Sequence, residues 1–332
     1  MAFLLLLVWI ALVLRESLGQ WGDTGELQLL KRGYILSNGD PSQTPLPRLL
    51  VVTLTSVNRK EYYDAVGETY MNELPTLMLT ESATPKCKLC GGARKEGRNG
   101  ALYSHTRYTE YSKESPGLEY FSWKSLEWKC AQQRPLQALK KTLVDFSNQN
   151  HEWVLLIDDD SYVHKQNMMK MLRGLNASEA IMLGNRIGGG AGFLISKGAT
   201  QALLQPSNNV DYSWDVDTKK WKEQGDSSGQ TSVLDKCIEA SLGGRYCFFH
   251  SDWLIKRCAD AAGVKVETRL RMYQDCPFAI QGLTNGTDTF NSDIFNTVLR
   301  SRMWKELLTC HRIDPHIMRG LHKIKVAHDK QE

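Results

Sequence analysis

The feature that most constrains the fold is a run of five apolar residues, Trp153 to Ile157, that ends in three consecutive aspartates. A short apolar run of this kind predicts a buried strand. Three carboxylates at the end of such a strand repel one another and are costly to desolvate, and a divalent cation offsets both penalties. Because ligand-binding loops lie at the carboxyl ends of strands in α/β sheets, Asp158, Asp159 and Asp160 predict a metal site, with a solvated acidic turn as the alternative. Successive residues point different ways, so the first and third aspartates can serve one ligand cluster while the second faces elsewhere.

Short apolar runs alternate with amphipathic segments along most of the chain, and this alternation predicts an α/β domain. Besides 153–157, strands are expected at 48–53, 76–80, 181–183 and 193–195. Helices are expected at 62–74, from Pro135 to a stop at 148–150, around 168–175, and at 197–205, 232–242, 251–262 and 292–308. The polar stretch 208–230 is expected to be an irregular insertion.

The N-terminus predicts entry into the secretory pathway. The apolar run from Ala2 to Leu14 is shorter than the roughly 20 residues of a spanning helix and typical of a signal-peptide core. Residues 1–19 are therefore expected to be a signal peptide, cleaved after Gly19, or a short signal anchor that holds the protein at a membrane. The polar, proline-containing residues 20–47 are expected to be a stem or linker, residues 48–320 the globular domain, and residues 321–332 a polar tail.

The cysteines and the charge balance agree with a lumenal protein. Eight cysteines, an even number, allow up to four disulfides, whose pairing the sequence does not determine. Cys87 and Cys90 have the spacing of half a zinc knuckle, but no second ligand pair follows, which favours disulfide chemistry. Asn176 and Asn285 lie in glycosylation sequons. Lys and Arg exceed Asp and Glu only by 41 to 37, with no basic run interleaved with aromatic residues, so a nucleic-acid partner is excluded.

The segment Gly188-Gly-Gly-Ala-Gly192 is a second candidate site element. Four glycines in five residues, bracketed by apolar strands, let the backbone approach a bulky ligand without interference from Cβ atoms. The segment is not a phosphate-binding P-loop, because no Lys-Ser or Lys-Thr pair follows at the required place.

Two single residues complete the candidate set. Asp252 follows Ser251, a good N-cap, and lies in the first turn of an expected helix, where the helix dipole favours the carboxylate form. Asp252 can serve in routine capping or, beside an active site, as a general base. His311 can be a structural or exposed histidine; if the fold places it near Asp160, the two complete a carboxylate and imidazole metal site of a kind that suits Mn²⁺.

Four segments together resemble the fringe-like β-1,3-glycosyltransferases, a group that includes the core 1 galactosyltransferases. The segment 153–163 resembles the family's strand-plus-DDD motif, and 189–196 resembles its GGAG-aromatic segment. Ser251-Asp252 with Cys258 resembles its late acidic pair, and 311–318 is similar to its C-terminal histidine segment. The segments occur in the family's order between about Arg48 and Met318. The acidic pair is reduced here to Ser251-Asp252, and 208–230 shows no match to the family's acceptor region.

The resemblance implies a GT-A-type domain at 48–320, with a mixed, mainly parallel central sheet flanked by helices. The implied activity is that of an inverting, metal-dependent transferase, which moves a hexose or N-acetylhexosamine from a UDP-sugar to a hydroxyl of a glycan or glycoprotein and forms a β-1,3 linkage. The implied cofactor is Mn²⁺ or Mg²⁺, and the implied location is the Golgi lumen, as a type II membrane protein, or the endoplasmic reticulum, with secretion if residues 1–19 are removed.

The resemblance also implies roles for individual residues. Asp160 and His311 would bind the metal, and Asp252 would be the general base. The residues implied in binding the UDP-sugar are Thr53, Arg59, Asp158, Asp159, Gly189, Gly190, Ala191 and Gly192. Two other functions remain open: a catalytically impaired relative that acts as a chaperone or glycan-binding protein, which the altered Ser251-Asp252 pair favours, and a metal-dependent nucleotide hydrolase. The retained aspartate trio argues against a pure binding module.

Overall fold

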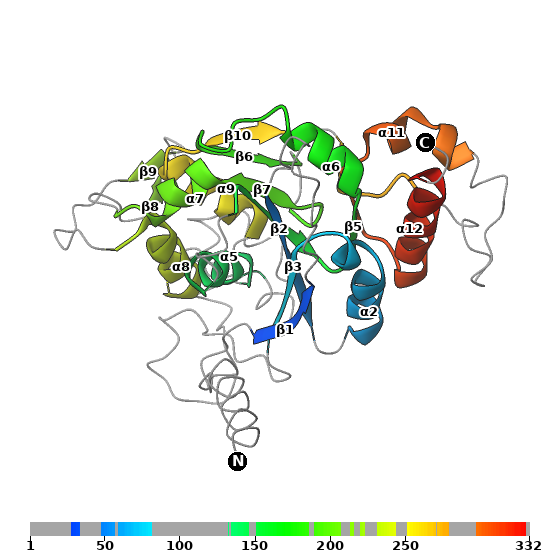
Figure 1. The fold of residues 1–332 in the computed structure, drawn as a ribbon. Helices are drawn as coiled ribbons and strands as arrows, with labels where there is room; N and C mark the ends of the chain where they lie inside the picture. Colours follow the sequence, from blue (N-terminus) through cyan, green and yellow to red (C-terminus); the bar gives the residue numbers. More distant parts are fainter. Residues whose placement is uncertain are drawn as a thin grey trace, which may run out of the picture.

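The computed structural model describes residues 28–33, 48–56, 59–81, 132, 134–145, 151–185, 189–206, 213–215, 220–222, 231–243, 251–269, 271–278 and 297–329. Its centre is a seven-stranded sheet with helices on both sides (Figure 1). The strand order is β1-β3-β2-β4-β7-β6-β10. The strand bounds are β1 Gln28–Gly33, β2 Leu49–Ser56, β3 Thr76–Glu81, β4 Trp153–Asp158, β6 Ile181–Gly184, β7 Phe193–Ser196 and β10 Lys265–Thr268.

The sheet is mixed and mainly parallel, as expected. The pairs β2/β3, β2/β4 and β6/β10 are parallel, whereas β1/β3, β4/β7 and β6/β7 are antiparallel. Five strands therefore run in one direction, and only β1 and β7 run against them. The carboxyl ends of β2, β4 and β6 and the amino end of β7 consequently meet at one edge of the sheet, where an α/β fold binds its ligands.

Alternate residues of the buried strands enter two separate cores, one on each face of the sheet. On one face pack the helices α5 Arg134–Asp145, α7 Lys197–Leu204, α8 Val233–Gly243 and α9 Ser251–Ala261. On the other pack α2 Lys60–Glu68, α6 Lys165–Leu172 and α12 Pro315–Asp329. Leu155 belongs to one core and its neighbour Leu156 to the other. The continuous apolar character of these strands thus follows from helical cover on both faces.

A three-stranded sheet extends the fold toward the C-terminus. It has the order β11-β12-β5, formed by Met272–Tyr273, Thr309–His311 and Ser161–Val163. Strand β12 pairs antiparallel with β5, and this register sets His311 opposite Ser161. Because β5 follows β4 after a two-residue turn, the pairing brings His311 to the three aspartates across about 150 residues of chain.

All five expected strands are confirmed, but several helix expectations need correction. The expected helix 62–74 is the shorter α2 followed by a 3₁₀ turn, Tyr70–Asn72. The single helix expected at 292–308 is wrong in its described part. That part breaks at Ser301, whose hydroxyl accepts a hydrogen bond from the Trp304 N–H and caps α11, Arg302–Glu306; β12 then follows. Within the expected irregular insertion 208–230, β8 Ser213–Asp215 and β9 Lys220–Lys222 form an antiparallel pair.

Two expected boundaries of the domain also differ. Strand β1 lies inside the expected stem 20–47 and pairs with β3, so the sheet begins before residue 48. The expected polar tail 321–332 is wrong at its start, because α12 runs through Asp329 and buries Leu321 and Ile324. Residues 1–27, which hold the expected signal segment, lie outside the described residues. Among the helices that are described, none is long and apolar enough to span a bilayer.

Two disulfides occur among the described residues: Cys237–Cys258 joins α8 to α9, and Cys276–Cys310 joins the segment after β11 to β12. The other four cysteines, including the pair Cys87 and Cys90, lie outside the described residues. The expectation of disulfide chemistry is thus confirmed for half of the cysteines.

Candidate functional site

A cavity of about 340 Å³ opens at the carboxyl edge of the central sheet. Its wall comes from the end of β2, the segments that lead into α2 and α5, the turn after β4, the glycine loop before β7, the start of α9, and β12 with the residues around it. The lining side chains with charge are Arg59, Arg134, Asp158, Asp159, Asp160, Asp252, His311 and Arg312. The volume lies within the range of small-ligand sites, and the mixture of carboxylates, imidazole and guanidinium groups is suited to a metal ion and an anion.

Asp158, Asp160 and His311 form a cluster that can hold a metal ion. Each offers one ligand atom, and the three atoms lie within 4.8 Å of one another. His311 Nε2 is 3.1 Å from Asp160 Oδ1 and 3.9 Å from Asp158 Oδ2. The first and third aspartates therefore share one ligand cluster, as the alternation of side chains predicts.

Asp159, between them, faces the other way and anchors the turn. Its side chain is 1% exposed and accepts a hydrogen bond of 2.6 Å from the Thr55 hydroxyl at the end of β2. Arg59 lies 2.9 Å from Asp159 Oδ1 and 3.5 Å from Asp160 Oδ2, while its guanidinium covers the Tyr62 ring at 4.0 Å. Arg59 thus offsets the charge of two aspartates at once and ties the turn to the start of α2.

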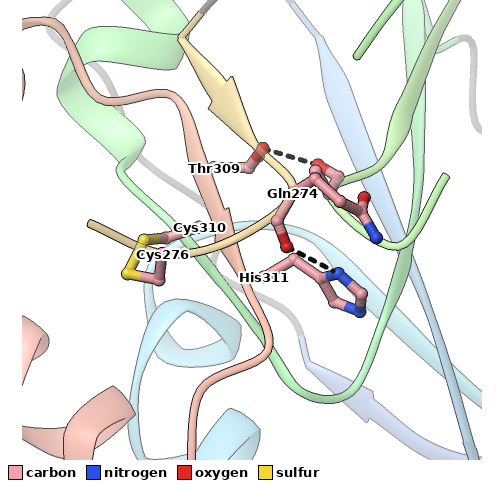
Figure 2. The surroundings of a disulfide bond; sticks show 6 residues. Gln274, Cys276, Thr309, Cys310 and His311 are labelled. Atoms are coloured by element: carbon pink, nitrogen blue, oxygen red, sulfur yellow. Dashed lines mark hydrogen bonds between the residues drawn. A yellow bond between two sulfur atoms is a disulfide. The ribbon is translucent and has the colours of Figure 1, made fainter. Parts of the chain in front are cut away.

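The imidazole of His311 is held in one orientation. Its Nδ1 lies 3.1 Å from the backbone carbonyl of Gln274, so Nδ1–H donates there and Nε2 faces the carboxylates (Figure 2). A backbone carbonyl on the far nitrogen is the usual partner of a metal-binding histidine. Burial lowers the pKa of His311, but its close contact with Asp160 and the charges of Asp160 and Asp158 outweigh this effect, and the pKa lies above its ordinary value.

The two ligand aspartates differ in their pKa values. Desolvation and the charge of Asp160 raise the pKa of Asp158 to about 6, against the opposing charge of His311. The pKa of Asp160 is lowered, because His311 and Arg59 stabilise its charge more than burial disfavours it. When no cation is bound, Asp160 is therefore ionised at neutral pH, whereas Asp158 takes up a proton as the pH falls to about 6.

The glycine loop makes room for two functional side chains. A Cβ on Gly189 would lie 2.0 Å from Asp252 Oδ1, and a Cβ on Gly190 would lie 2.1 Å from His311 Cε1. The Ser161 hydroxyl donates to the Gly190 carbonyl at 2.8 Å and holds the loop against β5. Glycine is thus required at both positions so that Asp252 and His311 can approach the loop backbone.

Asp252 lies in the first turn of α9, as expected, with its side chain against Gly189. It is 6% exposed and lines the cavity. Its neighbour Ser251 donates through both N–H and hydroxyl to Gln132 Oε1, each at 3.1 Å. Gln132 thus fixes the start of α9 and, with it, the position of Asp252.

Four residues expected at the site do not line the cavity: Thr53, Gly189, Ala191 and Gly192. Thr53 is fully buried in the core, where its hydroxyl shares a 3.0 Å hydrogen bond with Tyr70; Thr55, one pleat further along β2, reaches the site instead. Ala191 is buried, and its carbonyl accepts a 2.5 Å hydrogen bond from Thr309 (Figure 2). Gly192 packs against Leu155 with a φ of +103°, which favours glycine. Of the described loop residues, only Gly190 therefore lines the cavity.

The lining residues that were not expected from the sequence include Thr55, Gln132, Arg134, Gln274 and Arg312. Arg312 adjoins His311 and is the only described non-glycine residue with a positive φ, 59°. Of these five, only Thr55 carried a sequence signal, because it shares the face of Thr53 at the carboxyl end of the strand.

The ligand atoms of Asp158, Asp160 and His311 fit a divalent cation, and so does one buried oxygen that has no hydrogen-bond partner. Asp160 Oδ1 is buried and forms no well-aligned hydrogen bond, although His311 Nε2 lies nearby. Two carboxylates and one neutral imidazole match the preferences of Mn²⁺, whose sites take oxygen and nitrogen ligands. A cation between the three side chains would satisfy the orphaned oxygen.

The fold and the site together define an α/β domain with a carboxylate and imidazole cluster at the carboxyl edge of its sheet. Residues 103–188 match the family model described as Fringe-like, so the resemblance inferred from the sequence is confirmed for a stretch that contains all three aspartates. The match ends at the first glycine of the glycine loop, Gly188, and does not include Asp252 or His311.

Comparison with solved structures finds a glycosyltransferase involved in the glycosylation of the major capsid of PBCV-1. It shares 10% sequence identity with this chain, over 83% of this chain and 98% of its own, with a TM-score of 0.39. A likeness of this degree gives no information about individual residues. None of the curated proteins compared with the chain matches it.

Proposed function

We propose that this protein is an inverting, metal-dependent glycosyltransferase that moves a hexose or N-acetylhexosamine from a UDP-sugar to a hydroxyl of a glycan or glycoprotein, with a β-1,3 linkage. The observation that supports this most is the cluster of Asp158, Asp160 and His311 in a cavity that also holds Asp252. A metal site and a separate carboxylate are the two groups that inverting transfer from a sugar diphosphate requires.

The donor end of the reaction follows from the charges that line the cavity. Asp158, Asp160 and His311 would hold Mn²⁺ or Mg²⁺, which when bound supplies Lewis-acid stabilisation of the negative charge that develops on the departing diphosphate. Guanidinium groups bind phosphate oxygens in bidentate fashion, and the Arg312 side chain, 62% exposed, is more open to solvent than that of Arg59, 37% exposed. The ion pair of Arg312 with Asp275, itself 78% exposed, contributes little and can be exchanged for phosphate at small cost.

At the acceptor end, Asp252 would take the proton from the attacking hydroxyl. Gly189 leaves space beside the carboxylate, and Gln132 holds the start of α9 in place. General-base assistance of this type contributes on the order of 10²–10⁴ in rate. Attack from the face opposite the diphosphate would invert the anomeric centre.

The lumen of the secretory pathway, in the Golgi or endoplasmic reticulum, is the proposed location. The apolar segment 2–14 and the two disulfides support it, because disulfides persist in oxidising compartments. Retention of residues 1–19 would anchor the protein in the membrane, and cleavage would release it.

The test is UDP release from a panel of UDP-sugars with Mn²⁺, measured with and without glycan acceptors. Acceptor-dependent UDP release is expected for the wild type, and Asp160→Ala is expected to abolish both Mn²⁺-dependent UDP binding and transfer. Metal-dependent transfer by the Asp160→Ala protein would refute the proposal. UDP release that does not depend on acceptor would instead identify a metal-dependent nucleotide hydrolase.

A chaperone or glycan-binding protein is the second candidate, and one observation favours it. Where the family has an acidic pair, this chain has Ser251 before Asp252, and both the N–H and the hydroxyl of Ser251 donate to Gln132. Glycan binding that is equally strong with and without Mn²⁺, with no UDP release from any donor, would support this second function.

A further inference from the structure

A short segment after β11, residues 274–276, lies against His311 and its neighbours, and we call it the 274–276 strap. Each of its three residues contacts the segment 310–312, which comprises the last two residues of β12 and Arg312. Gln274 forms a hydrogen bond with His311, and Cys276 forms a disulfide with Cys310 (Figure 2). Asp275 forms an ion pair with Arg312. The Cys276 N–H also donates to the His311 carbonyl at 3.1 Å.

The strap continues a strand pairing that stops short of the site. Strands β11 and β12 pair in parallel at Met272 with Thr309 and at Tyr273 with Cys310. The next residue on each strand is Gln274 and His311, and there the contact changes from a backbone ladder to a carbonyl on an imidazole. The orientation of His311 thus depends on where the strap holds the Gln274 carbonyl.

The covalent bond is the strongest of the contacts that hold the strap. The Asp275–Arg312 pair is exposed on both sides, at 78% and 62%, and such pairs contribute little. Cys310, by contrast, is fully buried and lies opposite Tyr162 of β5, so one end of the disulfide is anchored in the core. The disulfide begins two residues after Gln274 and one residue before His311, close enough to limit the movement of both.

We propose that the Cys276–Cys310 disulfide is a positioning element of the metal site, which acts through the Gln274 carbonyl on His311. The inference rests on the proposed metal site but adds residues to it. With the bond in place, Nδ1–H has a fixed acceptor and Nε2 a fixed direction toward Asp158 and Asp160. Without it, the imidazole can rotate away from the carboxylates. Loss of the partner that orients a metal ligand typically lowers metal affinity about 10–100-fold.

The experiment compares two double variants of the full chain, each lacking one disulfide. Cys276→Ser/Cys310→Ser removes the bond beside His311, and Cys237→Ser/Cys258→Ser removes the one between α8 and α9. Mn²⁺ affinity is measured by calorimetry and by electron paramagnetic resonance of free Mn²⁺. The first variant is expected to bind Mn²⁺ about 10–100-fold more weakly than the wild type, and the control variant is expected to bind like the wild type.

A role through His311 is distinguished from general loosening by a third protein. In the His311→Ala background, removal of the Cys276–Cys310 bond is expected to change the remaining Mn²⁺ affinity by less than about twofold, because the residue that it positions is absent. An additive loss in that background overturns the inference.

Two further outcomes are informative. Wild-type Mn²⁺ affinity in the folded Cys276→Ser/Cys310→Ser protein overturns this inference alone, whereas no Mn²⁺ binding by the wild type overturns the proposed metal site as well. Should the double serine variant not fold, Gln274→Gly serves instead, because it keeps both sulfurs and loosens the backbone at the carbonyl. Weaker Mn²⁺ binding supports the inference, and unchanged binding overturns it.

Discussion

A methyl group added at Gly190 should displace His311 and weaken metal binding. The Cβ of Gly190→Ala would lie 2.1 Å from His311 Cε1 and 2.2 Å from Nε2, whereas ordinary contact begins at 3.4 Å. The imidazole or the loop must therefore move by about 1.3 Å. Metal–ligand distances tolerate only about 0.2 Å, so the histidine would be lost as a ligand. We expect Mn²⁺ affinity to fall at least about 10–100-fold, or about 1.4–2.8 kcal/mol.

Gly189→Ala is the matched control, because the neighbouring Cβ meets a different functional group. That Cβ would lie 2.0 Å from Asp252 Oδ1 and 2.6 Å from the Phe193 ring, away from the metal ligands. Gly189→Ala is therefore expected to keep Mn²⁺ affinity and to lose transfer. Calorimetric Mn²⁺ titration of both variants, with thermal melts to verify folding, makes the comparison. Wild-type Mn²⁺ affinity in folded Gly190→Ala would refute the reasoning.

Three further predictions concern proton and anion binding. Mn²⁺ affinity should fall as pH is lowered from about 8 to about 6, because metal binding requires deprotonated ligands. The pKa of His311 is raised above its ordinary value, and that of Asp158 is raised to about 6, so both ligands take up protons in this range. Calorimetry in several buffers would measure the affinity, and an affinity that does not depend on pH would contradict the prediction. Asp252→Asn should keep Mn²⁺ and UDP binding but slow transfer on the order of 10²–10⁴-fold, and equal transfer rates would exclude it as the base. Arg312→Ala should weaken UDP binding about 10–100-fold through loss of a charge-assisted hydrogen bond, while Arg302→Ala, 83% exposed and outside the cavity lining, should not.

The strands were the most predictable part of the fold. The run Trp153 to Ile157 must be buried wherever the chain places it, because five successive apolar side chains point alternately to both faces of a sheet. The last helix, α12, was missed because its sequence has polar residues along much of its length. The burial of Leu321 and Ile324 depends on the packing of α12 against α2 and β5. The break at Ser301 was also missed, since its cap is a local hydrogen bond inside a helix-like pattern.

In the candidate site, too, some features could be predicted from the sequence and others could not. The opposite directions of Asp158 and Asp159 follow from the geometry of an extended chain, and the glycines mark a close approach before its partner is known. The residues that contact these side chains could not be predicted from the sequence. Nothing in the local sequence of Gln274 sets it beside His311. Thr53 is equivalent to Thr55 in type and face, and only depth in the sheet separates the two.

The amino-acid sequence by itself determined which segments are buried strands and that three carboxylates crowd the end of one of them, because these are properties of neighbouring residues. Tertiary structure alone decided that an imidazole 150 positions away completes the cluster. That contact depends on the antiparallel register of β12 on β5, which sets His311 opposite Ser161, and on a disulfide that holds the Gln274 carbonyl behind the ring. Strand register is set by the pairing of whole strands, so no local pattern in the sequence contains it.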